Sequence, residues 1–159
     1  MTPHPPLCSS RTAGLATRSR YSRVMDLTLE NIGRLIAAAA TARAHAYAPY
    51  SGFQVGAALM LSDGRLVAGC NVENASYGLS VCAERNAVAA AIAAGSTSFG
   101  ALAVVTDSSP PSSPCGACRQ VLSEFGDMPV ILANTANERT VTSVAELLPN
   151  AFKGDALSR

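Results

Sequence analysis

The sequence has no tryptophan, only eight phenylalanine and tyrosine residues together, and little charge, since Asp, Glu, Lys and Arg make up 14% of its 159 residues. Globular domains carry about 25% charged residues, so part of the surface is expected to be covered by partners. No apolar run reaches the roughly 18 residues of a membrane-spanning helix. The net charge of +1 gives no basis for binding a nucleic-acid backbone. With 48% apolar residues, the chain has the size of one compact domain.

The charge is unevenly distributed along the chain. Residues 1–24 hold four arginines and no acid, so residues 25–159 carry eight basic and eleven acidic residues, a net charge of −3. We predict a disordered leader at 1–24 and a folded domain at 25–159. The leader lacks the apolar run of about 7–15 residues of a secretion signal, which favours a cytoplasmic protein. We interpret it as an over-extended start with Met25 as the working initiator, and an Arg- and Ser-rich transit peptide for an organelle is the alternative.

Hydrophobic periodicity and turn residues predict the order α-β-β-α-β-α-β-β-α. Helices interleaved with strands in this way predict a layered α/β domain with a mixed five-stranded sheet. The predicted helices are 28–46, 81–94, 115–125 and 144–148, and the predicted strands are 53–61, 65–72, 101–106, 129–133 and 139–143.

Five cysteines are an odd number, and in a reducing setting clustered cysteines indicate metal binding or catalysis rather than disulfides. Cys82 opens one predicted helix, Cys115 and Cys118 open the next, and the buried-type strand 101–106 joins the two. Such a unit brings both helix N-termini to the carboxyl end of the strand, where open α/β sheets bind ligands. The three cysteines are therefore expected to converge, whereas Cys70 is expected to be a small core residue and Cys8 to be incidental.

Three thiolates suit Zn²⁺, and two helix N-termini help to offset their charge. Because no fourth protein ligand is evident, the pattern is that of a catalytic zinc site with one open position. Glu84 lies two residues after Cys82, near the metal without being a ligand, where a carboxylate can move a proton. Taken alone, Glu84 would be an acid favoured by the helix dipole, and Cys-x-x-Cys could be a redox pair or half of a structural zinc site. Together the motifs are far more specific.

The motifs Cys82-Ala-Glu84 and Pro114-Cys-Gly-Ala-Cys118 resemble those of the small zinc-dependent cytidine deaminases that act on free nucleosides. The resemblance covers about residues 28–157. Other matching stretches are Tyr47–Ala57, Gly69–Asn74, Cys82–Ala87, Pro114–Leu122 and Leu147–Phe152.

The resemblance implies a three-layer α/β/α domain, one Zn²⁺ per subunit, and a homotetramer with shared sites. It implies hydrolysis of cytidine and 2′-deoxycytidine to the uridines and ammonia, as in pyrimidine salvage. The residues matching family positions are the metal ligands Cys82, Cys115 and Cys118, the proton shuttle Glu84, the ribose-binding Asn71 and Glu73, the base-packing Phe53, and Ala83, whose backbone contacts the pyrimidine. Tyr77 and Phe152 match family residues that reach a neighbouring subunit's site. Arg85 matches a family arginine that balances the thiolate charge, and Arg119 is a second candidate for that role.

Three other functions are compatible with the zinc motif. A deaminase of another aminopyrimidine nucleoside, such as blasticidin S, would share it, but Asn71 and Glu73 match the ribose-binding pattern. A deaminase of bases within DNA or RNA is disfavoured by the net charge of −3 over residues 25–159. A zinc-stabilised module without activity is disfavoured by the missing fourth ligand.

Overall fold

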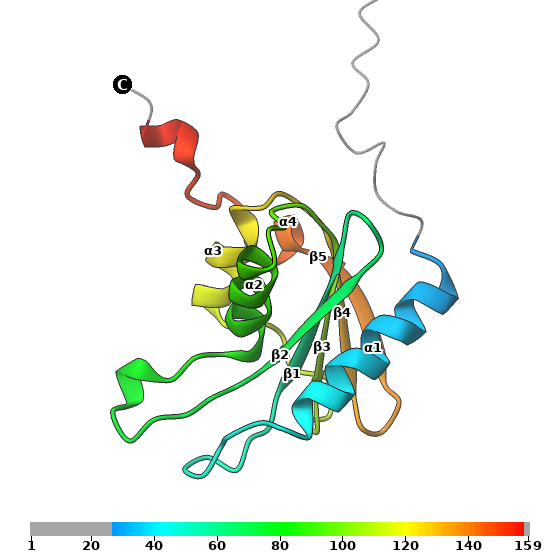
Figure 1. Ribbon diagram of the computed structural model, residues 1–159, viewed down its shortest axis with the longest axis vertical. Coiled ribbons are helices and arrows are strands. Elements are labelled where there is room, and N and C mark those ends of the chain that lie inside the picture. Colours follow the sequence, from blue (N-terminus) through cyan, green and yellow to red (C-terminus); the bar gives the residue numbers. More distant parts are fainter. Residues whose placement is uncertain (1–26, 158–159) are drawn as a thin grey trace, which may run out of the picture.

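The computed structural model describes residues 27–157, so the predicted leader lies outside the described residues. Its regular elements follow the predicted order, with two added 3-10 turns, η1 and η2 (Figure 1). The helices are α1 (Leu29–Arg43), α2 (Ala83–Ala93), α3 (Gly116–Ser123) and α4 (Val144–Leu147), the turns are η1 (Tyr77–Leu79) and η2 (Gly154–Leu157), and the strands are β1 (Gly56–Leu61), β2 (Leu66–Cys70), β3 (Phe99–Thr106), β4 (Pro129–Asn134) and β5 (Arg139–Ser143).

The five strands form one sheet in the order β2-β1-β3-β4-β5. The central pair β3 and β4 is parallel, and the other neighbouring pairs are antiparallel. The predicted mixed five-stranded sheet is therefore confirmed. Because α3 connects the two parallel strands, its N-terminus lies at their carboxyl ends, the edge at which such sheets bind ligands.

Two hydrophobic clusters, one on each face of the sheet, make the domain three-layered. On one face, Ile32, Leu35 and Ala39 of α1 pack against alternate strand residues such as Met60. On the other face, α2 and α3 pack against the strand residues that point the opposite way, such as Leu59. Figure 1 shows α1 alone on its side of the sheet, with α2 and α3 together on the other. All six residues of β1 are buried because side chains on both of its faces are covered.

Gly69 in β2 fixes how closely α2 approaches the sheet. A Cβ at this position would lie 2.5 Å from the backbone nitrogen of Ala87 and 2.8 Å from the carbonyl oxygen of Ala83. Only a residue without a side chain fits there. The N-terminal turn of α2 is therefore held directly against the edge strand.

The predicted strand and helix ends differ from the structure where side chains replace backbone pairing. The strands predicted at 53–61 and 65–72 are shorter, because the amide of Asn71 bonds the backbone of residues 53 and 55 in place of a ladder partner. Helix α1 ends at Arg43 rather than at 46, in a turn.

Cys70 is half-buried on an edge strand, with its sulfur 3.5 Å from the carbonyl oxygen of His45, so the expected core position is wrong. Within residues 27–157, no helix has the length and apolarity to cross a membrane.

Candidate active site

Three cysteines meet where α2 and α3 begin. Cys82 is the N-cap residue of α2, Cys115 is the N-cap residue of α3, and Cys118 lies in the first turn of α3. The Sγ atoms of Cys82 and Cys115 are 3.8 Å apart, those of Cys115 and Cys118 are 3.5 Å apart, and all three lie within 4.8 Å of one another. A tetrahedral zinc ion with Zn–S bonds of about 2.3 Å separates its sulfurs by about 3.8 Å. The thiol spacing therefore fits a zinc ion.

The electrostatics of the thiols favour a bound cation. The hydrogen bond from the Cys118 thiol, followed by that from the Arg85 guanidinium, lowers the pKa of Cys82 to about 5. The same contact with Cys82, together with burial, raises the pKa of Cys118. The contact therefore favours the thiolate at Cys82 and the protonated thiol at Cys118. A divalent metal would displace that proton, because thiolates are the metal-binding form.

Glu84 lies in the first turn of α2 and is only 4% exposed. Burial, which is the main cause, and the charge of Cys82 raise the pKa of its carboxyl group. A carboxyl group with a raised pKa, placed beside the thiols, holds a proton more readily than an exposed glutamate does and can pass it on. This is the property that a proton shuttle needs.

A cavity of about 280 Å³ lies over Cys82, Cys115 and Glu84. One wall comes from the loop between α1 and β1, a second from the residues after β2, and a third from the end of β3 and the loop that follows it. The lining residues are Ser51, Phe53, Val55, Asn71, Glu73, Cys82, Ala83, Glu84, Val104, Thr106, Ser112, Ser113 and Cys115.

Asn71 and Glu73 leave β2 on an extended segment that the backbone bridge from Val72 to Val81 holds in place. Both side chains bond the wall that contains Phe53. The Asn71 amide accepts from Val55 N at 2.8 Å and donates to the Phe53 carbonyl at 2.8 Å. The Glu73 carboxylate accepts from Tyr50 N at 2.9 Å, Ser51 N at 3.2 Å and the Ser51 hydroxyl.

These bonds have two consequences. The hydrogen bond from the Ser51 hydroxyl, followed by that from Tyr50 N, lowers the pKa of Glu73 and keeps it ionised at neutral pH. Both side chains also line the cavity, so they hold the loop in place and face the space that a ligand would fill. The sequence interpretation assigned them to a ligand only, and their contact with the loop could not be read from it.

Phe53 and Ala83 line the cavity from different elements, the loop after α1 and the start of α2. Phe53 is 39% exposed, and its backbone N–H donates to the Ser51 hydroxyl at 3.0 Å. Ala83 is fully buried at the first position of α2. The structure therefore brings Phe53, Asn71, Glu73, Ala83, Glu84 and two of the three cysteines to one cavity, with Cys118 behind them.

Comparisons with known proteins agree with this geometry. The family model described as the cytidine and deoxycytidylate deaminase zinc-binding region matches residues 29–134. The chain belongs to this family. It is 52% identical over 130 residues to a cytidine deaminase of Sporosarcina psychrophila, covering 80% of this chain and 96% of that protein. The crystal structure of a cytidine deaminase from Burkholderia pseudomallei is 54% identical with a TM-score of 0.74, covering 76% of this chain and 98% of that one.

Membership of the cytidine deaminase family confirms two expectations. The fold is that of the family, and the expected cofactor is zinc, since the matching region is a zinc-binding one. A curated cytidine deaminase of Halalkalibacterium halodurans is also 48% identical over 126 residues, covering 78% of this chain and 96% of that protein.

Of the two arginines considered for this cytidine deaminase site, Arg85 is the one near sulfur. Its guanidinium lies 3.6 Å from the Cys82 Sγ and 3.3 Å from the Ser80 carbonyl oxygen. Its Nε is buried with no hydrogen-bond partner among the described residues. Arg119 instead donates to the carbonyl oxygens of Pro114 and Leu147, at 2.7 and 2.9 Å. Arg119 therefore holds the loop before α3 rather than the thiols.

Tyr77 and Phe152 are not part of this chain's own cavity. Tyr77 is 75% exposed in η1, with its ring edge-on to Tyr50 at a centroid distance of 5.9 Å. Phe152 is 60% exposed in the C-terminal segment, where its carbonyl oxygen accepts from Gln120. The expectation places both in a neighbouring subunit's site, and it stays a prediction.

Sequence reasoning missed the hydroxyl groups on the wall after β3. Thr106, Ser112 and Ser113 all line the cavity. Thr106 bonds Ser108 at 2.9 Å, and Ser108 bonds Ser112 at 2.6 Å. The segment 107–114 is rich in Ser and Pro and matches no motif, and its position directly before Cys115 is the signal that it borders the site.

Proposed function

We propose that the protein hydrolyses cytidine and 2′-deoxycytidine to uridine and 2′-deoxyuridine, releasing ammonia. The observation that carries the proposal is the meeting of three thiols at two helix N-termini, beside a buried glutamate with a raised pKa at the floor of one cavity. Relatives at about half identity are named cytidine deaminases, which supports the choice of substrate.

Cys82, Cys115 and Cys118 would hold the zinc ion, and Arg85 would offset part of their negative charge. Zinc, when bound, supplies a Lewis acid that lowers the pKa of a coordinated water toward neutrality. Phe53 would pack against the base and the Ala83 backbone would contact its edge. Asn71 and Glu73 would hold the ribose as a hydrogen-bond donor and acceptor, using the bonding capacity that remains beyond their contacts with the loop.

Glu84 would move the protons of the reaction. It takes a proton from the attacking water and delivers it to N3 of the ring, while the water oxygen bonds C4. It then helps to protonate the amine, the C4–N4 bond breaks and ammonia leaves. One water is consumed, its oxygen becomes the carbonyl oxygen of uridine, and its two protons end on N3 and on ammonia.

The test follows the loss of cytidine absorbance and compares the purified parent protein with the Glu84→Gln variant. Because general acid–base catalysis contributes about 10²–10⁴-fold, we expect kcat/KM to fall by about that factor while zinc stays bound. The matched control is Glu124→Gln, at an exposed carboxylate in the C-cap position of α3, and it should keep full activity. Zinc-loaded Glu84→Gln with near-parental turnover would remove Glu84 from the mechanism. A higher kcat/KM for blasticidin S than for cytidine would reassign the substrate.

We also infer that the chain works as a homotetramer, with Tyr77 and Phe152 completing the site of another copy. Apolar side chains gather on the α2 side of the molecule, where Tyr77 and Leu79 are 75% and 67% exposed. The outer face of α2 presents alanines and Ile92 without a charge. Light scattering should give about 65 kDa, four times the 16.3 kDa chain. A monomer with full activity would contradict shared sites.

A further inference from the structure

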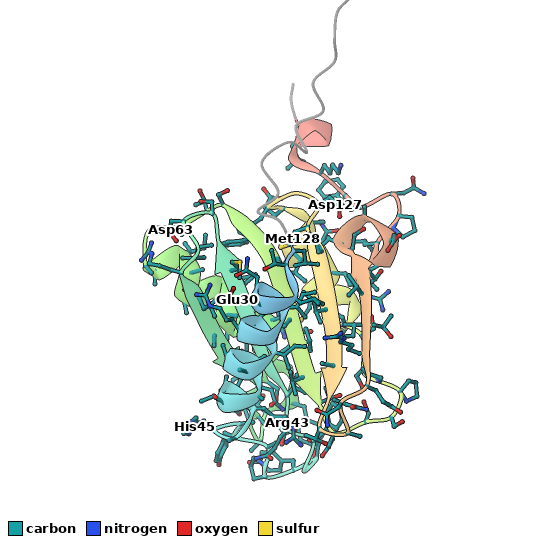
Figure 2. All side chains as sticks on the ribbon, turned by 90° about the vertical axis from the view of Figure 1, so that its right-hand side faces the viewer. Glu30, Arg43, His45, Asp63, Asp127 and Met128 are labelled. Atoms are coloured by element: carbon teal, nitrogen blue, oxygen red, sulfur yellow. The ribbon has the colours of Figure 1, made fainter. Side chains whose placement is uncertain are left out.

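Arg43, the last residue of α1, bonds two loops that are far apart in the sequence. Its Nε donates to the Gln54 carbonyl oxygen at 3.0 Å, and its Nη2 donates to the Asp107 carboxylate at 2.9 Å. The Arg43 side chain is 17% exposed and that of Asp107 is 49% exposed. Figure 2 shows Arg43 at the end of α1, beside the loops at that end of the sheet.

The two partners of Arg43 belong to two neighbouring segments of the cavity lining, which lie just beyond the Gly56–Val105 pair that ends the β1–β3 ladder. Gln54 lies between Phe53 and Val55, which both line the cavity from the loop after α1. Asp107 directly follows Thr106, which lines it from the end of β3. One guanidinium thus joins the wall that holds Phe53 to the wall that holds the hydroxyl groups.

We propose that Arg43 is a positioning residue that holds the loop before β1 against the loop after β3, where the ladder between these strands ends, and thereby sets the fit of the nucleoside. The inference rests on the proposed function for its substrate, but the bridge itself is a property of the chain. The guanidinium touches neither the cysteines nor Glu84, which lie on α2 and α3. Its loss should therefore weaken substrate binding more than it slows the chemical steps.

The sequence makes this bridge possible at Gly56, the first residue of β1. A Cβ there would lie 1.9 Å from the carbonyl oxygen of Ala39 and 2.5 Å from the backbone nitrogen of Arg43. Glycine is required for the end of α1 to approach the strand this closely. The approach brings the guanidinium between the two loops, and its several fixed N–H donors let it bond both at once, which the single nitrogen of lysine cannot do in the same geometry.

The second wall has other anchors, which differ from Arg43 in what they connect. Asn134 at the end of β4 donates to the Ser108 carbonyl oxygen at 3.0 Å and to Glu138 at 2.6 Å. Ser109 also donates to Glu138, at 2.8 Å. These bonds fasten the wall to β4 and to the turn after it, whereas Arg43 fastens it to the loop before β1.

The experiment compares Arg43→Met, which keeps an unbranched side chain without the donors, with the parent. A misplacement of about 1 Å can cost about 10²-fold in rate, and one lost bridge is a milder change, so we expect KM for cytidine to rise about tenfold with kcat changed less than about threefold. Arg43→Lys should fall between the two. The matched control is Arg65→Met, which removes an exposed pair with Asp63 at the other end of the sheet (Figure 2). It should leave both constants unchanged.

Two further measurements make the inference falsifiable without relying on activity alone. Asp107→Ala should add nothing to the KM of Arg43→Met, because both changes break the same bridge and coupled residues are non-additive. Amide hydrogen exchange of the zinc-loaded protein without substrate should speed up in Arg43→Met at both 50–55 and 107–113. Unchanged hydrogen exchange in either loop would overturn the inference. So would a double variant in which the effects of Arg43→Met and Asp107→Ala on KM multiply. An inactive parent would overturn the proposed function but leave the exchange result valid.

Discussion

Asn71→Ala tests the finding that a ligand-facing side chain also holds a wall of the cavity. The substitution removes the acceptor for Val55 N and the donor to the Phe53 carbonyl, both at 2.8 Å. Each such bond contributes a net 0.5–1.5 kcal/mol, so the two together contribute about 1–3 kcal/mol to the free energy of unfolding. For a domain of this size that corresponds to a fall in Tm of about 3–10 °C.

The assay is thermal unfolding of the zinc-loaded protein without substrate, so that any contact with a sugar plays no part. The matched control is Asn74→Ala, which also removes an amide but loses one exposed local bond to Ser76 N, at 2.8 Å. It should lower the free energy of unfolding by less than about 1 kcal/mol, as one exposed hydrogen bond does.

If Asn71→Ala unfolds at the parental temperature, its amide does not hold the wall. In that case Asn71 serves the ligand alone, as the sequence interpretation had it. If it loses both stability and cytidine affinity, the residue does both tasks, and the stability loss measures the share that belongs to the fold.

Three further predictions concern acid, metal and backbone packing. Hydrogen bonds depress the folded-state pKa of Glu73 below its ordinary value, so the stability from its charge is fully present above the unfolded-state pKa and is lost as the pH falls through the lower folded value. The Tm difference between the parent and Glu73→Gln should therefore be constant above about pH 5 and shrink on acidification. A difference that grows in acid would contradict this. Cys115→Ser should lose both zinc and activity, and treating the parent with a strong chelator should remove both until zinc is added back. Cys70→Ser should keep zinc and activity, since its sulfur lies beside a backbone carbonyl. Zinc retained by Cys115→Ser would remove Cys115 from the ligand set. Gly69→Ala should cost about 1–3 kcal/mol of stability by overpacking against α2, with Gly33→Ala in α1 as the control that meets no atom within 4 Å; equal Tm values for the two variants would refute the role of the close approach.

The hydrophobic pattern was sufficient to predict the fold because α1 has one apolar face and the central strands are short apolar runs. The strand 101–106 was recognised from its apolar run, and the structure buries it on both faces. The predicted element ends differ from the structure by up to three residues, where side-chain and backbone hydrogen bonds compete. At Arg43, the helix stops because the next residues turn toward Asn71, whose carbonyl oxygen accepts from Tyr47 N at 3.0 Å. That partner is 24 positions away in the sequence, and no local pattern reveals it.

The site divides in the same way between local motifs and long-range contacts. Cys82 and Glu84 sit at fixed offsets in one helix start and Cys115 and Cys118 in the next, so each motif fixes its own local geometry. The strand between the two helices brings the motifs together. The walls of the cavity are different, since each is a loop whose position depends on residues elsewhere in the chain. Arg43 lies on a helix that carries no cavity residue, yet it bonds both walls. In the sequence it is an ordinary basic residue in the last turn of a helix, which the helix dipole alone would explain. The chemistry of this family can therefore be found from motifs, whereas the features that fit the cavity to its substrate have to be sought in the contacts between its loops.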